Sequence, residues 1–327
     1  MLTGVGQHTK VAALAVALSV LALLVPRAAC AQGGAVPTAT SGAAAARLGT
    51  APLRVWHRTR GYGEETSETA LGTHWVLPAW GGQVFVDGQL RAGLSDHDLS
   101  TNVGLGYRWM SEGANGHPRI LGASVWYDGE DTNLDNWINQ IGVSFERLGP
   151  SLDMRLNANI PLEDLQVSDQ SAFGTTLYRD NVLAVNQTNG GDVPLRVVDF
   201  EMAPRVLDLN VWVYGGGYQM DGEDVSELGA KAGVRGYVVN DVVVDVGLTD
   251  DDLFGTTTTF QVIWTPGRTA PGCSDWSHRL ADRMREQVYR NMYVATRQIS
   301  VESTPLALDG THNPQQRPSS TTCLTRK

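Results

Sequence analysis

The sequence has few charged residues, and this scarcity narrows the possible folds. Only 18 % of the 327 residues are charged, while glycine alone supplies 36 residues. That balance is unusual for a soluble α/β enzyme and ordinary for a β-protein with many turns. Acidic side chains outnumber basic ones by 35 to 25, which gives a net charge of -10. Because phosphate binding needs clustered Lys and Arg, we expect no nucleic-acid partner.

Long hydrophobic runs are also scarce. The longest is Val11–Val25, whose 15 residues are too few to cross a bilayer comfortably as a helix. A lysine precedes this run, and Ala29-Cys30-Ala31 follows it with the small-x-small pattern of a signal-peptidase site. We therefore expect a secretory signal over residues 1–31, cleaved near Ala31. Lipidation at the cysteine is the alternative, but Arg27 stands where a lipobox has an aliphatic residue.

Elsewhere the sequence has no segment that approaches 18 consecutive apolar residues, so we expect no transmembrane helix in the mature chain. If the mature chain crosses a membrane, it must do so as a closed barrel. Only helices and closed barrels satisfy the hydrogen-bonding groups of the backbone in lipid.

Cysteine is scarce as well. Cys273 and Cys323 are the two that remain after the expected cleavage. Export to an oxidising compartment permits a disulfide between them, which would fix the C-terminal tail and not the body of the protein. Two free thiols are the alternative.

Alternation between apolar and polar residues is what the sequence has in abundance. In Leu152–Ile160 every even-numbered residue is apolar and every odd-numbered residue is polar or charged, and Asn102–Trp109 and Gln140–Glu146 repeat the pattern. A period of two is needed by a strand with two chemically different faces. Most such segments have about 9 to 12 residues, the length of a tilted strand that crosses a bilayer.

These segments predict an all-β fold, a transmembrane antiparallel up-and-down β-barrel of about 12 strands over residues 53–266, with a short C-terminal helix. The expected strands are 73–79, 84–93, 100–110, 119–129, 137–148, 152–161, 174–186, 194–203, 208–218, 228–239, 241–249 and 255–265. Short connections such as Gly149-Pro150-Ser151 alternate loosely with longer polar ones, as in outer-membrane barrels.

The polar faces of these strands carry charges of both signs, which can pair inside a barrel. We expect the polar faces to line the lumen and the apolar faces to contact lipid. The expected lumen-facing polar ladder is Arg108, Glu146, Asp153, Arg155, Asn157, Asn159, Lys231, Arg235 and Asp245. The aromatic residues expected in the interfacial girdles are Trp109, Trp126, Tyr127, Trp137, Tyr214, Tyr218 and Trp264. A soluble β-sandwich, whose faces meet a core and water, is the alternative.

Four consecutive segments carry an ordered set of motifs: Asn102–Arg108, Leu121–Asp128, Gln140–Glu146 and Met154–Pro161. The first is glycine-rich and ends in Arg, the second ends in Trp126-Tyr127-Asp128, the third ends in Glu and the fourth ends in Pro. In this order they resemble the barrel domain of the intimins and invasins, the inverse autotransporters. The resemblance covers about Gly61 to Pro266.

This resemblance implies a 12-stranded outer-membrane barrel with a C-terminal linker that threads the lumen and carries adhesive domains outward. Val288-Tyr289-Arg290-Asn291 also resembles the segment that follows the barrel in that family. Two departures concern function. Only about 60 residues follow the last strand, fewer than the ~100 of an immunoglobulin-like domain, and no peptidoglycan-binding module precedes the barrel. The resemblance therefore extends to the fold and not to an adhesive role.

The segment after the barrel, residues 267–301, has a different character. Trp276, Leu280, Met284 and Val288 recur at intervals of four, and Arg279, Arg283, Arg285 and Arg290 decorate the same segment. This spacing predicts a basic amphipathic helix over 276–294. The helix either occupies the lumen and pairs with interior carboxylates, or lies outside the barrel with a solvated face. Residues 32–52 are expected to be a flexible lead-in and residues 302–327 a disordered tail.

Motifs for catalysis are lacking. The sequence has no GxSxG nucleophile elbow, phosphate loop or Cys/His zinc spacing, so we expect no enzyme, no cofactor and no metal. Asp96-His97 could activate a water in principle, but it lies in a plain hydrophilic loop. The oxygen-rich stretch Asp128–Asp135 does not fit a twelve-residue calcium loop, so we expect a solvated outer loop there.

The function expected from the sequence is that of an outer-membrane, inverse-autotransporter-like barrel with a structural, adhesive or export role. A small-solute pore and a soluble secreted β-barrel binding protein are the alternatives. The expected partners are the lipid bilayer of the outer membrane and the barrel-assembly machinery. An extracellular partner would be bound by outer loops, and these carry no motif that identifies it.

Overall fold

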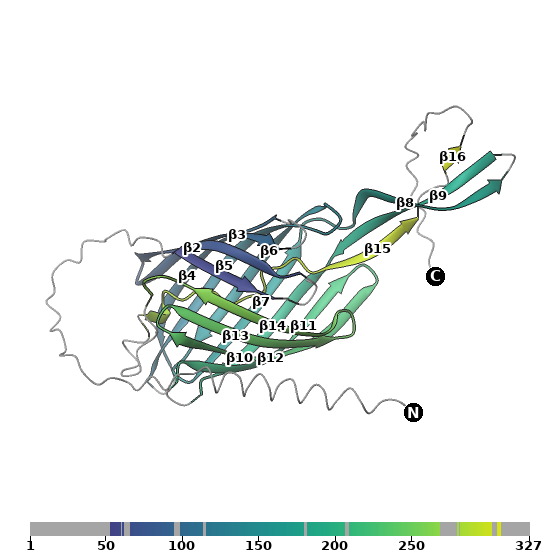
Figure 1. Cartoon of the computed structure of the whole chain (residues 1–327). Helices are drawn as coiled ribbons and strands as arrows, with labels where there is room; N and C mark the ends of the chain where they lie inside the picture. Colours follow the sequence, from purple (N-terminus) through teal and green to yellow (C-terminus); the bar gives the residue numbers. More distant parts are fainter. Residues whose placement is uncertain are drawn as a thin grey trace, which may run out of the picture.

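A closed β-barrel forms the body of the protein, and a hairpin projects from one end of it (Figure 1). The computed structural model describes residues 53–59, 61, 66–94, 99–113, 116–179, 182–206, 209–268, 280, 282–302 and 306–308, with side chains outside 169–187 and 302–308. The expected signal and lead-in, both C-terminal cysteines and Asp96-His97 lie outside the described residues. Most of the tail expected to be disordered, 302–327, lies outside them as well, but its residues 302 and 306–308 belong to strands β15 (Thr296–Glu302) and β16 (Leu306–Leu308), so the prediction is wrong there. Within that part of the chain, no helix is long and apolar enough to cross a membrane.

Twelve antiparallel strands close the barrel in the order β1-β14-β13-β12-β11-β10-β7-β6-β5-β4-β3-β2. Their bounds are β1 Leu53–Arg58, β2 Glu68–Ala79, β3 Gly82–Gly93, β4 Leu99–Glu112, β5 Pro118–Asp131, β6 Trp137–Leu148, β7 Leu152–Pro161, β10 Arg196–Pro204, β11 Val211–Gly222, β12 Val225–Val239, β13 Val242–Asp251 and β14 Gly255–Trp264. The predicted all-β class and the 12-stranded barrel are therefore confirmed.

The structure corrects one expected strand and adds one that was not expected. The strand expected at 174–186 is not in the barrel, because β7 pairs directly with β10 and the chain between them forms the separate hairpin of β8 and β9. In β8 neither the odd-numbered nor the even-numbered residues are consistently apolar, so this strand has no face suited to lipid. Conversely β1, which was not among the expected strands, closes the barrel by pairing with both β2 and β14. Its six residues are too few to give a clear period.

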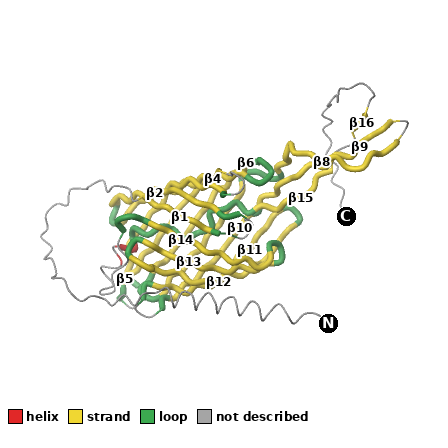
Figure 2. Tube along the Cα trace, in the orientation of Figure 1, coloured by secondary structure: helices red, strands yellow, loops and turns green. Residues whose placement is uncertain are grey.

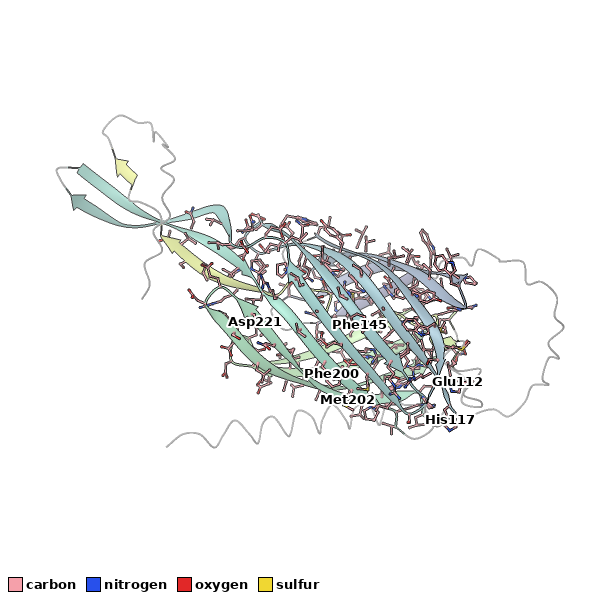
Figure 3. The ribbon with its side chains drawn as sticks, turned by 180° about the vertical axis from the view of Figure 1, so that it is seen from behind. Glu112, His117, Phe145, Phe200, Met202 and Asp221 are labelled. Carbon is pink, nitrogen blue, oxygen red and sulfur yellow. The ribbon has the colours of Figure 1, made fainter. Side chains whose placement is uncertain are left out.

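The wall of the barrel reverses the burial pattern of a soluble protein. Leu105 and Phe145 are 59 % and 54 % exposed on the outside, whereas Arg108 is fully buried on the inside. Figure 3 shows Phe145, Phe200 and Met202 on the middle of the wall, with Glu112 and His117 near one end. A continuous apolar belt with polar ends is the surface of a transmembrane β-barrel, because in water it would be an aggregation-prone patch.

The expected aromatic girdle is only partly correct. Trp109, Tyr127, Trp137 and Trp264 lie on the outer face, and the last three are among the exposed residues. Trp126, Tyr214 and Tyr218 lie inside: the Trp126 indole donates to Ser124 Oγ, and the two tyrosine hydroxyls donate to Asp245 and Asp251. Alternate residues of a strand lie on the same face, so Trp126 lies inside together with Ser124 and Asp128.

The two ends of the barrel differ. At one end, called here the terminal end, β1 begins and β14 finishes, and the connections are residues 80–81, 113–117, 149–151, 205–210 and 240–241. The other end, called the hairpin end, carries β8 (Gln166–Arg179) and β9 (Val182–Pro194). Figure 2 shows turns closing both ends while the hairpin continues beyond the barrel.

A charge placed in the middle of the outer belt tests its contact with hydrocarbon. Leu105 faces Val125 in the β4–β5 register, at mid-strand. We expect Leu105→Arg to lower the free energy of unfolding by about 2–4 kcal/mol in lipid vesicles, because Arg is costly at the bilayer midplane. Urea unfolding followed by tryptophan fluorescence measures this. Trp80→Arg, in the exposed β2–β3 turn, is the matched control and should change stability much less; equal losses would contradict the belt.

Candidate functional site: the occupied lumen

The C-terminal segment runs through the inside of the barrel. A single helical turn at the terminal end, closed by the bond from Met284 N–H to Leu280 O at 2.9 Å, begins the described part of it. Residues 286–295 are not helical, and β15 (Thr296–Glu302) follows at the hairpin end. The helix predicted over 276–294 is therefore wrong beyond residue 285, and its first residues up to 279 lie outside the described chain.

Length explains why this segment is extended. Ten residues, 286–295, separate the helical turn from β15. Ten extended residues span ~33 Å, whereas ten helical residues span ~15 Å. Since the hydrocarbon core of a bilayer is ~30 Å thick, only the extended chain reaches from one end of the barrel to the other.

At the terminal end, apolar packing and an ion-pair cluster hold the helical turn. Leu280 and Met284 pack with Ile120 and Leu148 of the wall. The Arg283 guanidinium donates to both carboxylate oxygens of Asp153, at 2.9 and 2.5 Å. Of the expected apolar stripe, Leu280, Met284 and Val288 are buried against the barrel wall, and Val288 is not helical. Trp276 lies outside the described residues.

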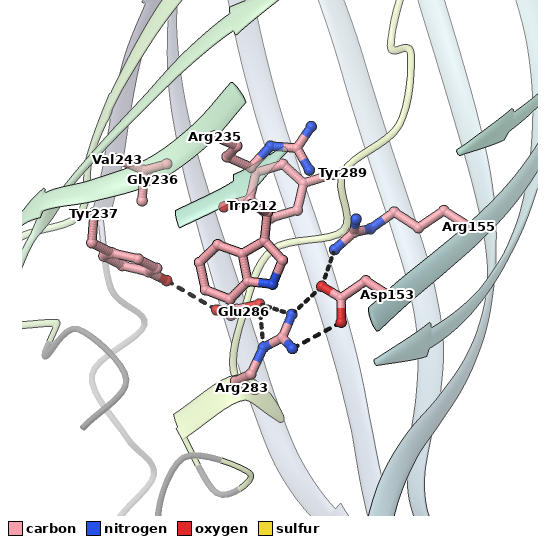
Figure 4. A pocket seen from close by; sticks show the side chains of 10 residues that line it. All are labelled: Asp153, Arg155, Trp212, Arg235, Gly236, Tyr237, Val243, Arg283, Glu286 and Tyr289. Atoms are coloured by element: carbon pink, nitrogen blue, oxygen red, sulfur yellow. Dashed lines mark hydrogen bonds and ion pairs between the residues drawn. The ribbon is translucent and has the colours of Figure 1, made fainter. Parts of the chain in front are cut away.

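Glu286 links this cluster to the opposite wall, as Figure 4 shows. Its carboxylate accepts hydrogen bonds from the Tyr237 hydroxyl at 3.1 Å and from Arg283 at 3.3 Å. Asp153, the other carboxylate that accepts from Arg283, lies 3.4 Å from Arg155 Nη2. Charges from β7 and the segment therefore alternate in sign, and the Tyr237 hydroxyl of β12 continues the network across the lumen.

Arg108 of β4 terminates the helical turn. Its Nη1 donates to the backbone carbonyls of Met284, at 3.1 Å, and of Glu286, while its Nε pairs with Glu146. Carbonyls at the end of a helix have no partner within the helix. A wall arginine that supplies the missing donor lets the chain leave the helical conformation without burying an unsatisfied group.

The centre of the lumen holds the most enclosed ion pair. Both nitrogens Nη1 and Nη2 of Arg290 donate to Asp128, and both side chains are completely buried. Asp128 also accepts hydrogen bonds from Asn102 Nδ2 at 2.6 Å and Gln140 Nε2 at 3.1 Å. The Arg290 guanidinium lies 4.2 Å from the ring centroid of Trp126. Charge, hydrogen bonds and an aromatic face thus all fix this residue.

Wall side chains also satisfy the backbone of the extended residues. Arg91 Nη2 and Asn102 Nδ2 each donate to Met292 O at 3.0 Å, and Gln140 Nε2 donates to Tyr293 O at 3.0 Å. Val294 N–H donates to Glu130 at 2.9 Å. An extended chain outside a sheet has no ladder of its own, so these side chains replace it.

Tyr293 closes the hairpin end of the lumen. Its hydroxyl donates to Glu68, and the Arg58 guanidinium lies 3.4 Å from its ring centroid. Ala295 then packs in a buried apolar cluster with Leu195 and Val197 of the wall. The segment is therefore enclosed at the exit as well as at the entry.

In the wall formed by β10–β14, the charged side chains pair mainly with each other and not with the segment. Lys231 pairs with Asp199 at 2.7 Å, and Arg235 with Asp245 at 2.6 Å. Arg235 also lies over the Tyr289 ring, 3.8 Å from its centroid. Between this wall and the segment a cavity of about 120 Å³ remains. The segment thus fills the β2–β7 side of the lumen more tightly than the β10–β14 side.

Every residue of the expected polar ladder lies on a barrel strand and faces inward. Three of them bond the segment directly: Arg108, Asp153 and Asn159, whose Nδ2 donates to Asn291 O at 3.3 Å. The others pair within the wall or stack on Tyr289, as Arg155 does. Of the arginines expected on the helix, Arg283 and Arg290 form the ion pairs above, and Arg279 lies outside the described residues.

Sequence reasoning missed an important part of the site, which comprises Glu68, Arg91, Asn102, Asp128, Glu130 and Gln140. Asp128 and Glu130 were placed in a solvated loop, but β5 continues to Asp131 and both carboxylates face the lumen. The alternation of β5 could have shown this, because Asp128 and Glu130 follow Ser124 and Trp126 at every second residue and therefore lie on the same face.

Comparisons with known proteins agree with the fold. No protein-family model and no curated protein matches the sequence. A membrane-protein structure from a study of in-meso crystallization has a TM-score of 0.51 at 13 % identity, covering 76 % of this chain and 99 % of its own. Two others have lower TM-scores. The outer membrane protein Omp33 of Acinetobacter baumannii has 0.31 (8 % identity, 66 % and 98 % covered), and the β domain of the Bordetella autotransporter BrkA has 0.27 (12 %, 67 % and 98 %).

Neutralising Asp128 tests the central ion pair. We expect Asp128→Asn to destabilise the protein by about 3–5 kcal/mol, because it leaves the Arg290 guanidinium buried without its counter-charge. The double variant Asp128→Asn with Arg290→Gln should recover a good part of that loss. Unfolding in urea and the temperature of heat-modified migration on gels measure both. A double variant no more stable than Asp128→Asn alone would argue against a direct pair.

Proposed function

We propose that the protein is an outer-membrane barrel that carries its own C-terminal segment through its lumen and holds it on the outer face of the membrane, as inverse autotransporters do. The observation that carries this proposal is the course of residues 282–302, from the terminal end to the hairpin end, inside a closed barrel. The bilayer of the outer membrane and the barrel-assembly machinery are the partners that such a barrel requires.

The orientation follows from the ends of the strands. In outer-membrane barrels the short turns face the periplasm and the longer insertions face outward. The terminal end has turns of two and three residues at 80–81, 240–241 and 149–151, while the hairpin end carries β8 and β9. On this orientation residues 296–302 lie outside the cell, and an adhesive or structural role belongs to what they present.

The nature of the lumen contacts supports a segment that belongs there. Hydrogen bonds from wall side chains reach the backbone at Met284, Asn291, Met292 and Tyr293, and buried arginines pair at both Asp153 and Asp128. An incidental occupant would leave some of these buried charges unpaired, at a cost of several kcal/mol each. The wall and the segment are complementary in charge and in hydrogen-bonding groups.

Surface labelling tests the display of the segment. In a variant with Cys273 and Cys323 replaced by Ser, we expect Ser300→Cys to react with a membrane-impermeant maleimide on intact cells, because Ser300 is exposed at the hairpin end. Ser151→Cys, in the exposed turn at the terminal end, is the matched control and should react only after the cells are lysed. The reverse pattern, or protection of both, would refute the proposed orientation.

A small-solute pore is the second candidate, and the cavity of about 120 Å³ beside β10–β14 is the observation in its favour. Single-channel recording separates the two functions. We expect the full-length protein to conduct poorly and a version stopped after Pro266 to give large stepwise currents, because the emptied lumen of a 12-stranded barrel admits water. Equal conductance of the two proteins would show that the segment does not close the lumen.

A further inference from the structure

The hairpin of β8 and β9 carries the part of the C-terminal segment that has left the barrel. β15 pairs antiparallel with β9 over seven residue pairs, from Thr296↔Pro194 to Glu302↔Thr188. β16 (Leu306–Leu308) continues along the same edge and pairs with Leu183–Val185. The other edge of β9 is occupied by β8 (Figures 1 and 2). A strand from the far end of the sequence thus completes a sheet that stands apart from the barrel wall.

The base of the hairpin is also held by contacts that do not involve the C-terminal segment. The Asp192 carboxylate, fully buried, accepts hydrogen bonds from Thr132 Oγ1 at 2.5 Å and Asn136 Nδ2 at 2.9 Å. Ser168 Oγ of β8 donates to Leu134 O at 2.9 Å. All of these groups belong to β8, β9 or the β5–β6 connection. These contacts attach the hairpin to the barrel independently of β15.

Two glycines leave space on β9 for what packs against it. A Cβ at Gly190 would lie 2.9 Å from Leu134 Cδ1, and a Cβ at Gly191 would lie 3.0 Å from Leu165 Cδ1 and 3.1 Å from Val301 Cγ2. Leu134 belongs to the β5–β6 connection, Leu165 to the β7–β8 connection and Val301 to β15. Glycine in a strand often marks such a close approach. The pair Gly190-Gly191 thus fits β9 both to its support and to the arriving strand.

The ladder between β9 and β15 begins where the segment leaves the lumen. Leu195 N–H donates to Ala295 O at 2.8 Å, directly before the first pair of β15. In an antiparallel ladder, hydrogen-bonded pairs alternate with pairs that are not hydrogen-bonded. Because Ala295 is bonded to Leu195, the N–H groups of Arg297, Ile299 and Val301 also point towards β9. Those of Gln298 and Ser300 point away. Because β15 is continuous with the lumen segment, this ladder joins the hairpin to the part of the chain that has left the barrel.

We propose that the β8–β9 hairpin is a preformed strand-addition template that captures the C-terminal segment as it emerges and prevents it from sliding back. Strand addition to a free sheet edge is a recurrent way of binding an extended peptide through its backbone. Here the peptide is the protein's own chain, delivered through the lumen. This inference rests on the proposed function, since capture needs a segment that has crossed the membrane.

Disulfide trapping tests the pairing in cells. With Cys273 and Cys323 replaced by Ser, Thr188→Cys and Glu302→Cys stand directly opposite each other in the register. Opposite residues have Cβ atoms ~4.5–5.5 Å apart, so we expect rapid oxidation to a disulfide. Thr188→Cys with Val301→Cys is the control, because neighbouring residues of a strand point to opposite faces. If both pairs oxidise at the same rate, β15 is not held in this register.

Proline substitution tests capture itself. Ile299→Pro removes an N–H that points to β9, whereas Ser300→Pro removes one that points away, and Ile299→Ala controls for the lost side chain. We expect Ile299→Pro to increase cleavage of residues 296–308 by external protease at least several-fold, with heat-modifiable migration of the barrel unchanged. Ser300→Pro and Ile299→Ala should resemble the parent, because an edge strand tolerates proline on its outer side.

The outcomes separate this inference from the function on which it rests. If Ser300→Cys is not labelled on intact cells, the display of the segment is wrong and capture falls with it. If Ser300→Cys is labelled but the opposed cysteines do not cross-link, or Ile299→Pro and Ser300→Pro are cleaved equally, the segment is displayed and the hairpin does not capture it. Labelling, register-specific cross-linking and selective sensitivity to Ile299→Pro together support capture.

Discussion

The structure depends on one constraint: charges and backbone groups enclosed in the barrel must find partners there, since lipid surrounds the wall. Alternation places a polar side chain on the inner face at every second residue, and a barrel with many such residues is costly unless their charges are matched. Asp128 shows how this is met, because Asn102, Gln140 and Arg290 all donate to it. One of those donors comes from outside the wall, so the wall and the segment depend on each other.

This dependence connects architecture with function. Arg108 satisfies carbonyls of the segment while it pairs with Glu146 of its own wall, and Arg91 bridges Glu68, Glu130 and the carbonyl of Met292. The lumen therefore has the chemistry of a binding groove for an extended peptide, closed into a tube. Outside the tube, β9 offers a second kind of complementarity through its backbone edge. Side chains hold the segment in the lumen, and a strand ladder holds it beyond.

The four sequence motifs that resemble those of intimins and invasins have a common place in this structure. The four ordered motifs lie in β4, β5, β6 and β7, and their last polar residues face the lumen: Arg108, Asp128, Glu146 and Asn159. Three of these four side chains bond the segment, and Glu146 holds Arg108. The motifs that carry the resemblance are thus the residues that hold a chain inside the barrel, which gives them a physical reason to occur together.

The sequence by itself determined the barrel, because apolar and polar residues that alternate over strands of bilayer length are compatible with few other folds. The same alternation determined that residues such as Arg155 and Asp245 lie inside. The tertiary structure decided what local patterns cannot express. The four-residue spacing of Leu280, Met284 and Val288 indicated a helix, but the distance through the lumen and the donors on the wall favoured an extended chain. Likewise only the direct pairing of β7 with β10 excluded residues 166–194 from the barrel, since strand composition does not specify which neighbour a strand will meet.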